Sequence, residues 1–274
     1  MTRKTVLITG ASSGMGYAAA KLFAKRGWRV YAGARRVEKI PGGANIYALY
    51  LDVTDETSIR NFAQFAISHA PRIDVLINNA GYGEFGPLEE VGVQRVRKQL
   101  NTNLVGASEL TKLVLPTMRK QGAGRIVNIS SIGGDMYSPM GGWYYVTKHA
   151  LNVWSDTLDS EVRQFGIRSV IVEPGGTASS WSEIAMNNAQ ANLRENSPYA
   201  KLTEAMVTLF NQMNSSTHAT SADLARVFYQ AATDTIPRHR YFYSLGDRLL
   251  GHFSRAHQAT FHSLLNVVTN QLLK

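Results

Sequence analysis

Short apolar runs alternate with longer stretches of helical periodicity from the start of the chain to Glu173. The runs predict six strands: Val6–Thr9, Arg29–Gly33, Ile46–Asp52, Val75–Asn78, Arg125–Ile129 and Arg168–Glu173. The stretches between them predict helices over Gly14–Arg26, Asp55–His69, Val93–Lys120 and Trp143–Phe165. Strands that alternate with helices form βαβ units, whose crossovers are almost always right-handed. The pattern therefore predicts an α/β fold built on a doubly wound parallel sheet.

The chain reads as one domain covering residues 1–274. Its first predicted strand is apolar at nearly every position, as expected of a strand that helices cover on both faces. No linker and no shift in composition interrupts the chain, which is long enough to bury a sizeable core without disulfides.

The last hundred residues have a different character. Between about 177 and 216 there is no strand pattern, and an apolar stripe at helical spacing predicts a helical lid. Ser221 is predicted to cap a helix over Asp223–Ala232, and Tyr241–Ser244 to form an edge strand. Residues 245–274 are predicted to form a helical extension. Its apolar side could dock on the core or on another subunit, or attach shallowly to a membrane.

Composition narrows the classes of function. The 29 Lys and Arg outnumber the 20 Asp and Glu, a formal charge of +9, but the cations are scattered and no basic stripe interleaves with aromatic residues. We therefore expect no nucleic-acid partner. No stretch of about 18 apolar residues and no signal peptide occurs, so a cytoplasmic protein is expected.

Metal and thiol chemistry are not expected either. The chain has no cysteine, which excludes disulfides and a cysteine nucleophile. His252, His257 and His262 are five residues apart and would not share one helix face, so we interpret them as surface or packing residues.

A glycine-rich turn follows the first strand, at Thr9–Gly16. Glycines allow a sharp turn and a close approach of the backbone to a ligand. The free amides at the start of the next helix form a site for a phosphate group. The turn therefore predicts a nucleotide site, although a tight turn that binds nothing would look similar.

The spacing Gly10-x-x-x-Gly14-x-Gly16 resembles the signature of the classical short-chain dehydrogenase/reductase family. Further matches follow in the order that this family shows: Asp52-Val53, Asn78-Asn79-Ala80-Gly81, Asn103, Ser131, Tyr144-x-x-x-Lys148 and Pro174-Gly175. The resemblance covers roughly residues 1–180. It implies a Rossmann fold and an oxidoreductase that transfers hydride between a nicotinamide cofactor and a carbonyl or alcohol.

The resemblance also implies which residues hold the cofactor. They are Gly10, Ser12, Ser13, Gly14, Met15, Gly16, Arg35, Arg36, Asp52, Val53, Asn79, Ala80, Gly81, Tyr144, Lys148, Pro174, Gly175, Thr177 and Ser179. NAD-binding sheets usually carry an acidic residue at the end of the second strand, but here Ala34 takes that position and Arg35-Arg36 follow. Arginine can bind a 2′-phosphate through two hydrogen bonds. We therefore expect NADP(H).

Tyr144 and Lys148 are four residues apart, hence on one face of a helix. A nearby ammonium would lower the phenol pKa from about 10 toward the range that a general acid/base needs. By resemblance, Tyr144 is the acid/base, Ser131 orients the substrate, Lys148 holds the ribose, and Asn103 anchors a water of the proton relay. Tyr145 and Ser130 are the neighbouring alternatives.

The lid predicts the substrate class. Apolar residues that could line a pocket are Met140, Trp143, Trp181, Met186 and Met206. Few charges accompany them, so we expect a hydrophobic ketone or aldehyde, steroid-like or long-chain. The resemblance also implies a homodimer or homotetramer, through the helix Trp143–Phe165. The alternative function is a dinucleotide-sensing regulator that keeps the fold without turnover.

Overall fold

The computed structural model of the chain describes residues 3–177, 181–215 and 219–273. Its sheet is parallel, with the strand order β3-β2-β1-β4-β5-β6-β7. The strands are β1 (Thr5–Thr9), β2 (Arg29–Ala34), β3 (Ile46–Tyr50), β4 (Val75–Asn78), β5 (Gly124–Ile129), β6 (Ile167–Val172) and β7 (Arg240–Tyr241). The predicted doubly wound α/β fold is confirmed.

Two apolar layers cover the sheet, because successive side chains of a strand point to opposite faces. In β1, Val6 and Ile8 join one layer and Leu7 joins the other. The first layer contains α1 (Gly14–Lys25) and α8 (Ser221–Thr233). The second contains α2 (Glu56–His69), α4 (Gly106–Gln121) and α5 (Gly142–Val162).

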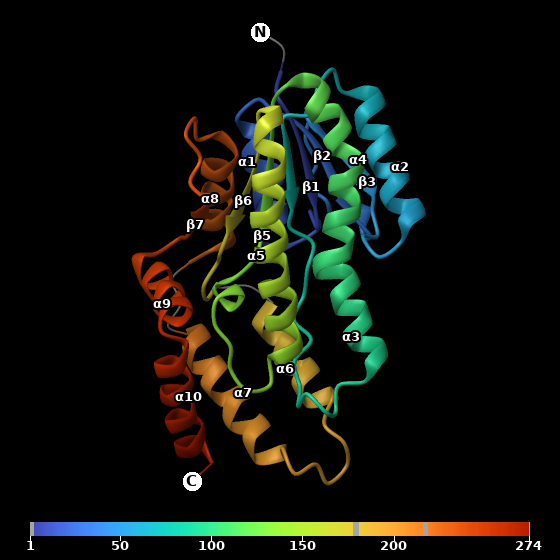
Figure 1. Cartoon of the computed structure of the whole chain (residues 1–274). Coiled ribbons are helices and arrows are strands. Elements are labelled where there is room, and N and C mark those ends of the chain that lie inside the picture. Colours follow the sequence, from blue (N-terminus) through green and yellow to red (C-terminus); the bar gives the residue numbers. More distant parts are fainter. Residues whose placement is uncertain (1–2, 178–180, 216–218, 274) are drawn as a thin grey trace.

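Four more helices lie toward the end of the molecule opposite the N-terminus (Figure 1). They are the lid helices α6 (Trp181–Ala191) and α7 (Ala200–Ser215), and the C-terminal helices α9 (Leu245–Ala256) and α10 (Gln258–Leu272). The carboxyl ends of the strands point toward this end, where open α/β sheets place their ligands.

Two local predictions need correction. The expected long helix Val93–Lys120 is divided into α3 (Val93–Leu100), a π-helical turn (Asn101–Val105) and α4. Thr220, rather than Ser221, caps α8, because Thr220 and Asp223 exchange hydrogen bonds in a capping box.

The predicted edge strand is also shorter and earlier than expected. It is Arg240–Tyr241, in register with Ile171–Val172 of β6. Only these two residues pair with β6, so the predicted strand Tyr241–Ser244 extends beyond the paired residues.

The C-terminal helices dock on the rest of the chain. Ser254 Oγ of α9 donates to the carbonyl of Asp135 at 2.6 Å. Tyr137 contacts α10, with its hydroxyl 3.1 Å from Nδ1 of His262. His262 is thus an exposed residue that contacts Tyr137, and the extension packs on its own chain. In the part of the chain that the structure describes, no helix has the length and apolar character of a membrane span.

A buried carboxylate joins α5 to the start of β6. Asp159 is 2% exposed and accepts bonds from Arg168 Nε (2.9 Å), Arg163 Nε (2.7 Å) and the amide of Ser169 (2.9 Å). Burial opposes ionisation, but these hydrogen bonds lower the pKa of Asp159 overall.

Asp159→Ala would leave the donors around this position without their acceptor. We expect the free energy of unfolding to fall by about 3–5 kcal/mol, as when one partner of a buried ion pair is removed. Urea denaturation at neutral pH measures the change. Glu161→Ala, which removes an exposed carboxylate two residues away, is the control. A loss in Asp159→Ala no larger than in the control would contradict the expectation.

Candidate active site

The glycine turn between β1 and α1 closely matches its expected shape. Gly10 and Gly14 have φ angles of 69° and 54°, which favour glycine. A side chain on Gly16 would collide with the carbonyl of Gly10 and the amide of Asn79. Ser13, at the N-cap of α1, makes no side-chain capping bond, so the first amides of the helix are open to a ligand. The turn therefore fits a bound pyrophosphate.

Asn79 supports this turn. Its Nδ2 donates to the carbonyls of Thr9 (2.9 Å) and Gly10 (3.3 Å). The Thr9 hydroxyl accepts the amides of Asn79 and Ala80, both at 2.9 Å. The side chain of Asn79 thus holds the glycine turn against β4, a role that the motif alone does not show.

Arg35 and Arg36 are exposed after β2, and the buried Ala34 precedes them. Arg35 lies close enough to Asp52 for its charge to lower the carboxyl pKa, together with hydrogen bonds from Thr54 and against the effect of burial. Burial raises the pKa of Tyr82, next to Gly81, to about 12, and the charge of Arg35 opposes this rise. The charge of Arg35 therefore acts on two groups near the predicted adenosine site.

Asn103 lies in the π-helical turn and is 2% exposed. Its Nδ2 donates to the carbonyl of Tyr82 (2.9 Å) and to Thr147 Oγ1 (3.0 Å), while its Oδ1 accepts the amide of Tyr82 (3.0 Å). The side chain therefore joins the loop after β4 to α5. The water predicted at Asn103 stays a prediction.

Tyr144, Lys148 and Ser131 come together at the carboxyl end of β5. The Ser131 hydroxyl lies near enough to the Tyr144 phenol to oppose the effect of burial on the phenol pKa. The ammonium of Lys148 lies 5.8 Å from the centre of the Tyr144 ring and donates to the carbonyl of Ile129 at 2.8 Å. Tyr144 and Lys148 are both 6% exposed.

The neighbouring alternatives point elsewhere. The hydroxyl of Tyr145 is 2.7 Å from Ser138 Oγ. The hydroxyl of Ser130 donates to the backbone carbonyl of Lys148 at 3.4 Å. The geometry therefore favours Tyr144 and Ser131 as the pair that faces a substrate.

The protonation of Tyr144 differs from the expectation. Burial raises the pKa of Tyr144, and the hydrogen bond with Ser131 lowers it only in part. Burial also lowers the pKa of Lys148 to about 8. The lowering of the phenol pKa by Lys148 is thus not seen, because desolvation dominates in this closed site. A protonated phenol is suited to donate a proton to a carbonyl oxygen.

The loop after β6 closes the site from the other side. The carbonyl of Pro174 accepts the amide of Ile132 at 3.0 Å and the Ser131 hydroxyl at 3.4 Å. Thr177 Oγ1 donates to the carbonyl of Gly175 at 3.3 Å. Ser179, also predicted to contact the cofactor, lies outside the described residues.

The lid places an apolar cluster over the phenol. Trp181 and Phe85 have ring centres 5.0 Å and 5.7 Å from that of Tyr144. The predicted residues Met140, Met186 and Met206 belong to the same buried cluster. Phe85 has no motif of its own, and it stands between Glu84 and Gly86, so no apolar run in the sequence indicates it.

Trp143 does not join the lid cluster. Its indole nitrogen donates to the carbonyl of Leu88 at 3.4 Å, on the outer side of α5. One helical step separates Trp143 from Tyr144, which turns the two side chains about 100° apart. Trp143 thus lies outside the cluster that covers the phenol, and its part in a substrate pocket stays a prediction.

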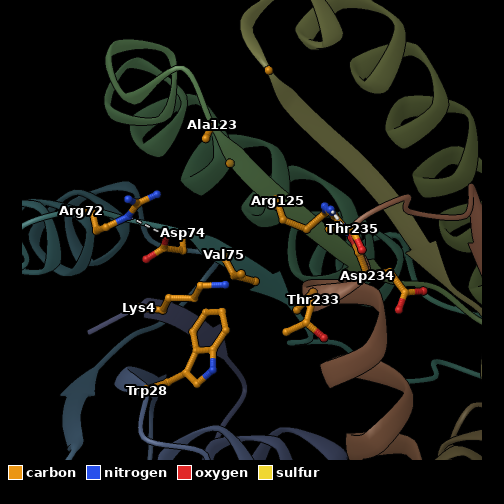
Figure 2. Close-up of a pocket in the computed structure, with 13 residues that line it drawn as sticks. Lys4, Trp28, Arg72, Asp74, Val75, Ala123, Arg125, Thr233, Asp234 and Thr235 are labelled. Atoms are coloured by element: carbon orange, nitrogen blue, oxygen red, sulfur yellow. Dashed lines mark hydrogen bonds and ion pairs between the residues drawn. The ribbon is translucent and has the colours of Figure 1, made fainter. Parts of the chain in front are cut away.

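A second pocket lies at the opposite edge of the sheet and has a different character. Figure 2 shows Arg72 beside Asp74, and Arg125 beside the end of α8. Arg72 Nε is 2.6 Å from Asp74, and Arg125 donates to the carbonyls of Ala231 (2.6 Å) and Asp234 (3.0 Å). No predicted site residue lines this pocket.

With this geometry established, comparison with known proteins identifies the class. Residues 4–191 match the family described as short chain dehydrogenase, so the chain belongs to that family. A 3-ketodihydrosphingosine reductase of Bacteroides thetaiotaomicron is 42% identical over 175 residues, which are 64% of each chain. An uncharacterized oxidoreductase of Bacillus subtilis, YusZ, is 35% identical over 243 residues, 85% of this chain and 86% of that protein.

Solved structures agree. A short-chain dehydrogenase from Streptomyces avermitilis is 30% identical and has a TM-score of 0.80, over 96% of this chain and 95% of that one. Structures that share the fold include complexes with NAD and complexes with NADP. The protein is therefore an oxidoreductase of the short-chain dehydrogenase family.

Proposed function

We propose that the protein is an NADPH-dependent reductase of a hydrophobic ketone or aldehyde, with Tyr144 as the general acid/base. The apolar cluster over the phenol carries this proposal. Trp181, Phe85 and the lid methionines surround the position that a carbonyl next to Tyr144 would occupy. Burial of apolar surface would thus supply most of the substrate affinity.

Each residue then has a defined part in the reaction. Bound NADPH supplies the hydride. Ser131 donates a hydrogen bond to the substrate oxygen, and Tyr144 transfers its proton to that oxygen as the alcohol forms. Lys148, whose pKa burial lowers to about 8, holds the ribose hydroxyls and can share its proton with the relay.

NADPH rather than NADH is proposed on the charges after β2. The buried Ala34 cannot accept a hydrogen bond from a ribose 2′-hydroxyl, and no carboxylate there would repel a 2′-phosphate. Arg35 is exposed, and its charge already acts on Asp52. A guanidinium in this place fits a phosphate dianion.

The substrate is proposed to be a long-chain ketone. The reductase from Bacteroides thetaiotaomicron, which is 42% identical over the matched residues, is named for 3-ketodihydrosphingosine. Methionines such as Met140, Met186 and Met206 adapt to flexible alkyl chains, since their side chains are unbranched and flexible.

A turnover panel tests this function. NADPH oxidation would be followed with 3-ketodihydrosphingosine, long-chain and short-chain ketones, aldehydes and a ketosteroid. We expect kcat/KM to rise with the apolar surface of the substrate, by up to about fourfold for each methylene group that becomes buried. Equal rates with short, polar ketones would contradict the substrate class. Cofactor binding without any turnover would instead support a dinucleotide-sensing regulator.

We also propose a homo-oligomer that forms through α5. Val146 and Val153 are seven residues apart, on one side of α5, and are 48% and 67% exposed. Light scattering would give the subunit number. Val153→Glu is expected to lower it if this face is the interface.

A further inference from the structure

A buried ionic cluster lies directly beneath the loop that follows β6. At its centre is Glu173, which is fully buried. Its Oε1 accepts Asn152 Nδ2 at 3.1 Å and lies 3.1 Å from Arg240 Nε. Asn152 comes from α5 and Arg240 from β7, so the carboxyl group joins three elements.

The other oxygen of Glu173 has no donor. Oε2 is buried, and no N–H or O–H among the described residues reaches it. The carboxyl group of Asp135 is instead within hydrogen-bonding reach of Glu173. Asp135 in turn is 2.9 Å from Arg255 Nη1 of α9. Two ionised carboxylates cannot hydrogen-bond to each other, so this contact requires a proton between them.

The charges around the pair support the same conclusion. Three carboxyl groups, of Asp135, Glu173 and Asp156, face two guanidinium groups, of Arg240 and Arg255. His239 also contacts Asp156, on the partly exposed side of the cluster. One proton on the Asp135–Glu173 pair brings these three carboxyl and two guanidinium groups to zero net charge. An unbalanced charge at a fully buried position would be costly.

The pair connects the two loops that form the catalytic site. Ser131 begins a tight turn that ends at Asp135, closed by a bond from the Gly134 amide to the Ser131 carbonyl at 2.8 Å. Glu173 directly precedes Pro174, whose carbonyl meets Ser131 and Ile132. A bond between Asp135 and Glu173 therefore fixes the turn of Ser131 relative to the Pro174–Gly175 loop.

Helix α9 reinforces this connection. Ser254 and Arg255 hold the backbone and the side chain of Asp135. Asp247 packs so closely on Gly175 that a side chain at position 175 would collide with its carboxylate. The C-terminal extension thus contacts both loops.

We propose that Asp135 and Glu173 share one proton and that this pair is a positioning device, which holds Ser131 in register with the nicotinamide-binding loop. The proposal deepens the proposed function and rests on it for the role of Ser131. Neither residue touches substrate or cofactor.

Stability against pH tests the shared proton without any need for turnover. Burial, followed by the negative charge of Asp135, raises the pKa of Glu173 from 4.5 to about 8. The folded protein then keeps a proton that the unfolded chain loses, so the stabilisation is complete below pH 4.5 and is lost as the pH rises toward 8. This one group would raise the unfolding constant by up to about tenfold per pH unit. Lys148 stays protonated in both states over most of this range.

Urea denaturation between pH 5 and 8 would be compared for the native chain, Glu173→Gln and Asp135→Asn. In both variants the new side-chain amide can donate a hydrogen bond across the pair, so no shared proton is needed. Both variants are therefore expected to lose this part of the pH dependence of the free energy of unfolding. Glu161→Gln, which neutralises an exposed carboxylate outside the cluster, is the control that keeps it. If the free energy of unfolding depends on pH equally in the native chain, Glu173→Gln and Asp135→Asn, the proposal of a shared proton is wrong.

Kinetics test the positioning role. Glu173→Ala is expected to lower kcat by about 10- to 100-fold, as for a small misplacement of a catalytic group, while the Kd of NADPH changes little. Glu173→Gln should restore most of kcat. An unchanged kcat in Glu173→Ala, or a failure of Gln to restore it in a folded protein, would overturn the role. If the native chain itself lacks turnover, the proposed function is wrong. The pH dependence of the free energy of unfolding still tests whether Asp135 and Glu173 share a proton.

Discussion

Tyr144→Phe is expected to lower kcat/KM for carbonyl reduction by at least about 10²–10⁴-fold, the usual contribution of a positioned proton donor. The change removes only the hydroxyl that transfers the proton. The ring keeps its packing against Trp181 and Phe85, at 5.0 Å and 5.7 Å, so the lid and the fold should persist. The Kd of NADPH should stay nearly constant, because the glycine turn and Arg35 provide most of its binding.

Tyr145→Phe is the matched control for this variant. It removes a neighbouring buried hydroxyl, which is 2.7 Å from Ser138 and does not face Ser131. We expect it to keep most of the activity. Steady-state rates at several pH values, with NADPH binding measured by fluorescence, would compare the two. Retained turnover in Tyr144→Phe, or an equal loss in both variants, would contradict the role of Tyr144.

Arg35→Ala is expected to weaken NADPH binding by about 10- to 100-fold, the free energy of one or two charge-assisted hydrogen bonds to the 2′-phosphate. NADH lacks that phosphate, so its Kd should change little, and the preference between the cofactors should narrow or reverse. Titration of the free enzyme with each cofactor measures both constants.

Arg36→Ala is the control that distinguishes a direct contact of Arg35 with the 2′-phosphate from a general attraction of the cofactor by positive charge. Both arginines are exposed and adjacent, but only Arg35 is seen to influence Asp52 and Tyr82. The Arg36 variant should therefore show a smaller loss that disappears at higher salt. Equal effects of the two substitutions would show that the region attracts the cofactor only through its charge. A tighter Kd for NADH than for NADPH in the native chain would reject the proposed cofactor.

The sheet could be predicted from the sequence because its signal is local. The runs around Val6–Thr9 and Val75–Asn78 are apolar at successive positions, which a strand buried on both faces requires. The ends of elements were less certain, since they depend on single side chains. Thr220 rather than Ser221 caps α8, and a π-helical turn at Asn101–Val105 interrupts a pattern that reads as one helix.

The candidate catalytic group could also be predicted, because its residues carry short motifs with fixed spacing. Tyr144 and Lys148 lie on one helix face, and Ser131 ends a strand beside them. The protonation of Tyr144 could not be predicted, since it depends on burial by the distant lid. Burial raises the pKa of the Tyr144 phenol. The ammonium of Lys148 donates to the carbonyl of Ile129 instead of to the phenol, and its charge does not offset this rise.

The Asp135–Glu173 pair had no signal in the sequence. Asp135 and Glu173 are far apart along the chain, and the cations that neutralise them, Arg240 and Arg255, lie farther still. Arg240 is part of a group of basic residues that reads as a solvated surface, yet its side chain is only 12% exposed. Long-range electrostatic contacts of this kind follow from the fold and not from local patterns.

We infer that the Tyr144 phenol lies between Ser131 and the reacting carbon of a bound nicotinamide. A crystal structure of the protein with NADP and a long-chain ketone or alcohol would test it most directly. The phenol oxygen and the Ser131 hydroxyl should both lie about 2.6–3.2 Å from the substrate oxygen, with the nicotinamide C4 facing the same carbon. A phenol that points away from the substrate oxygen, with the cofactor and substrate in place, would contradict the account.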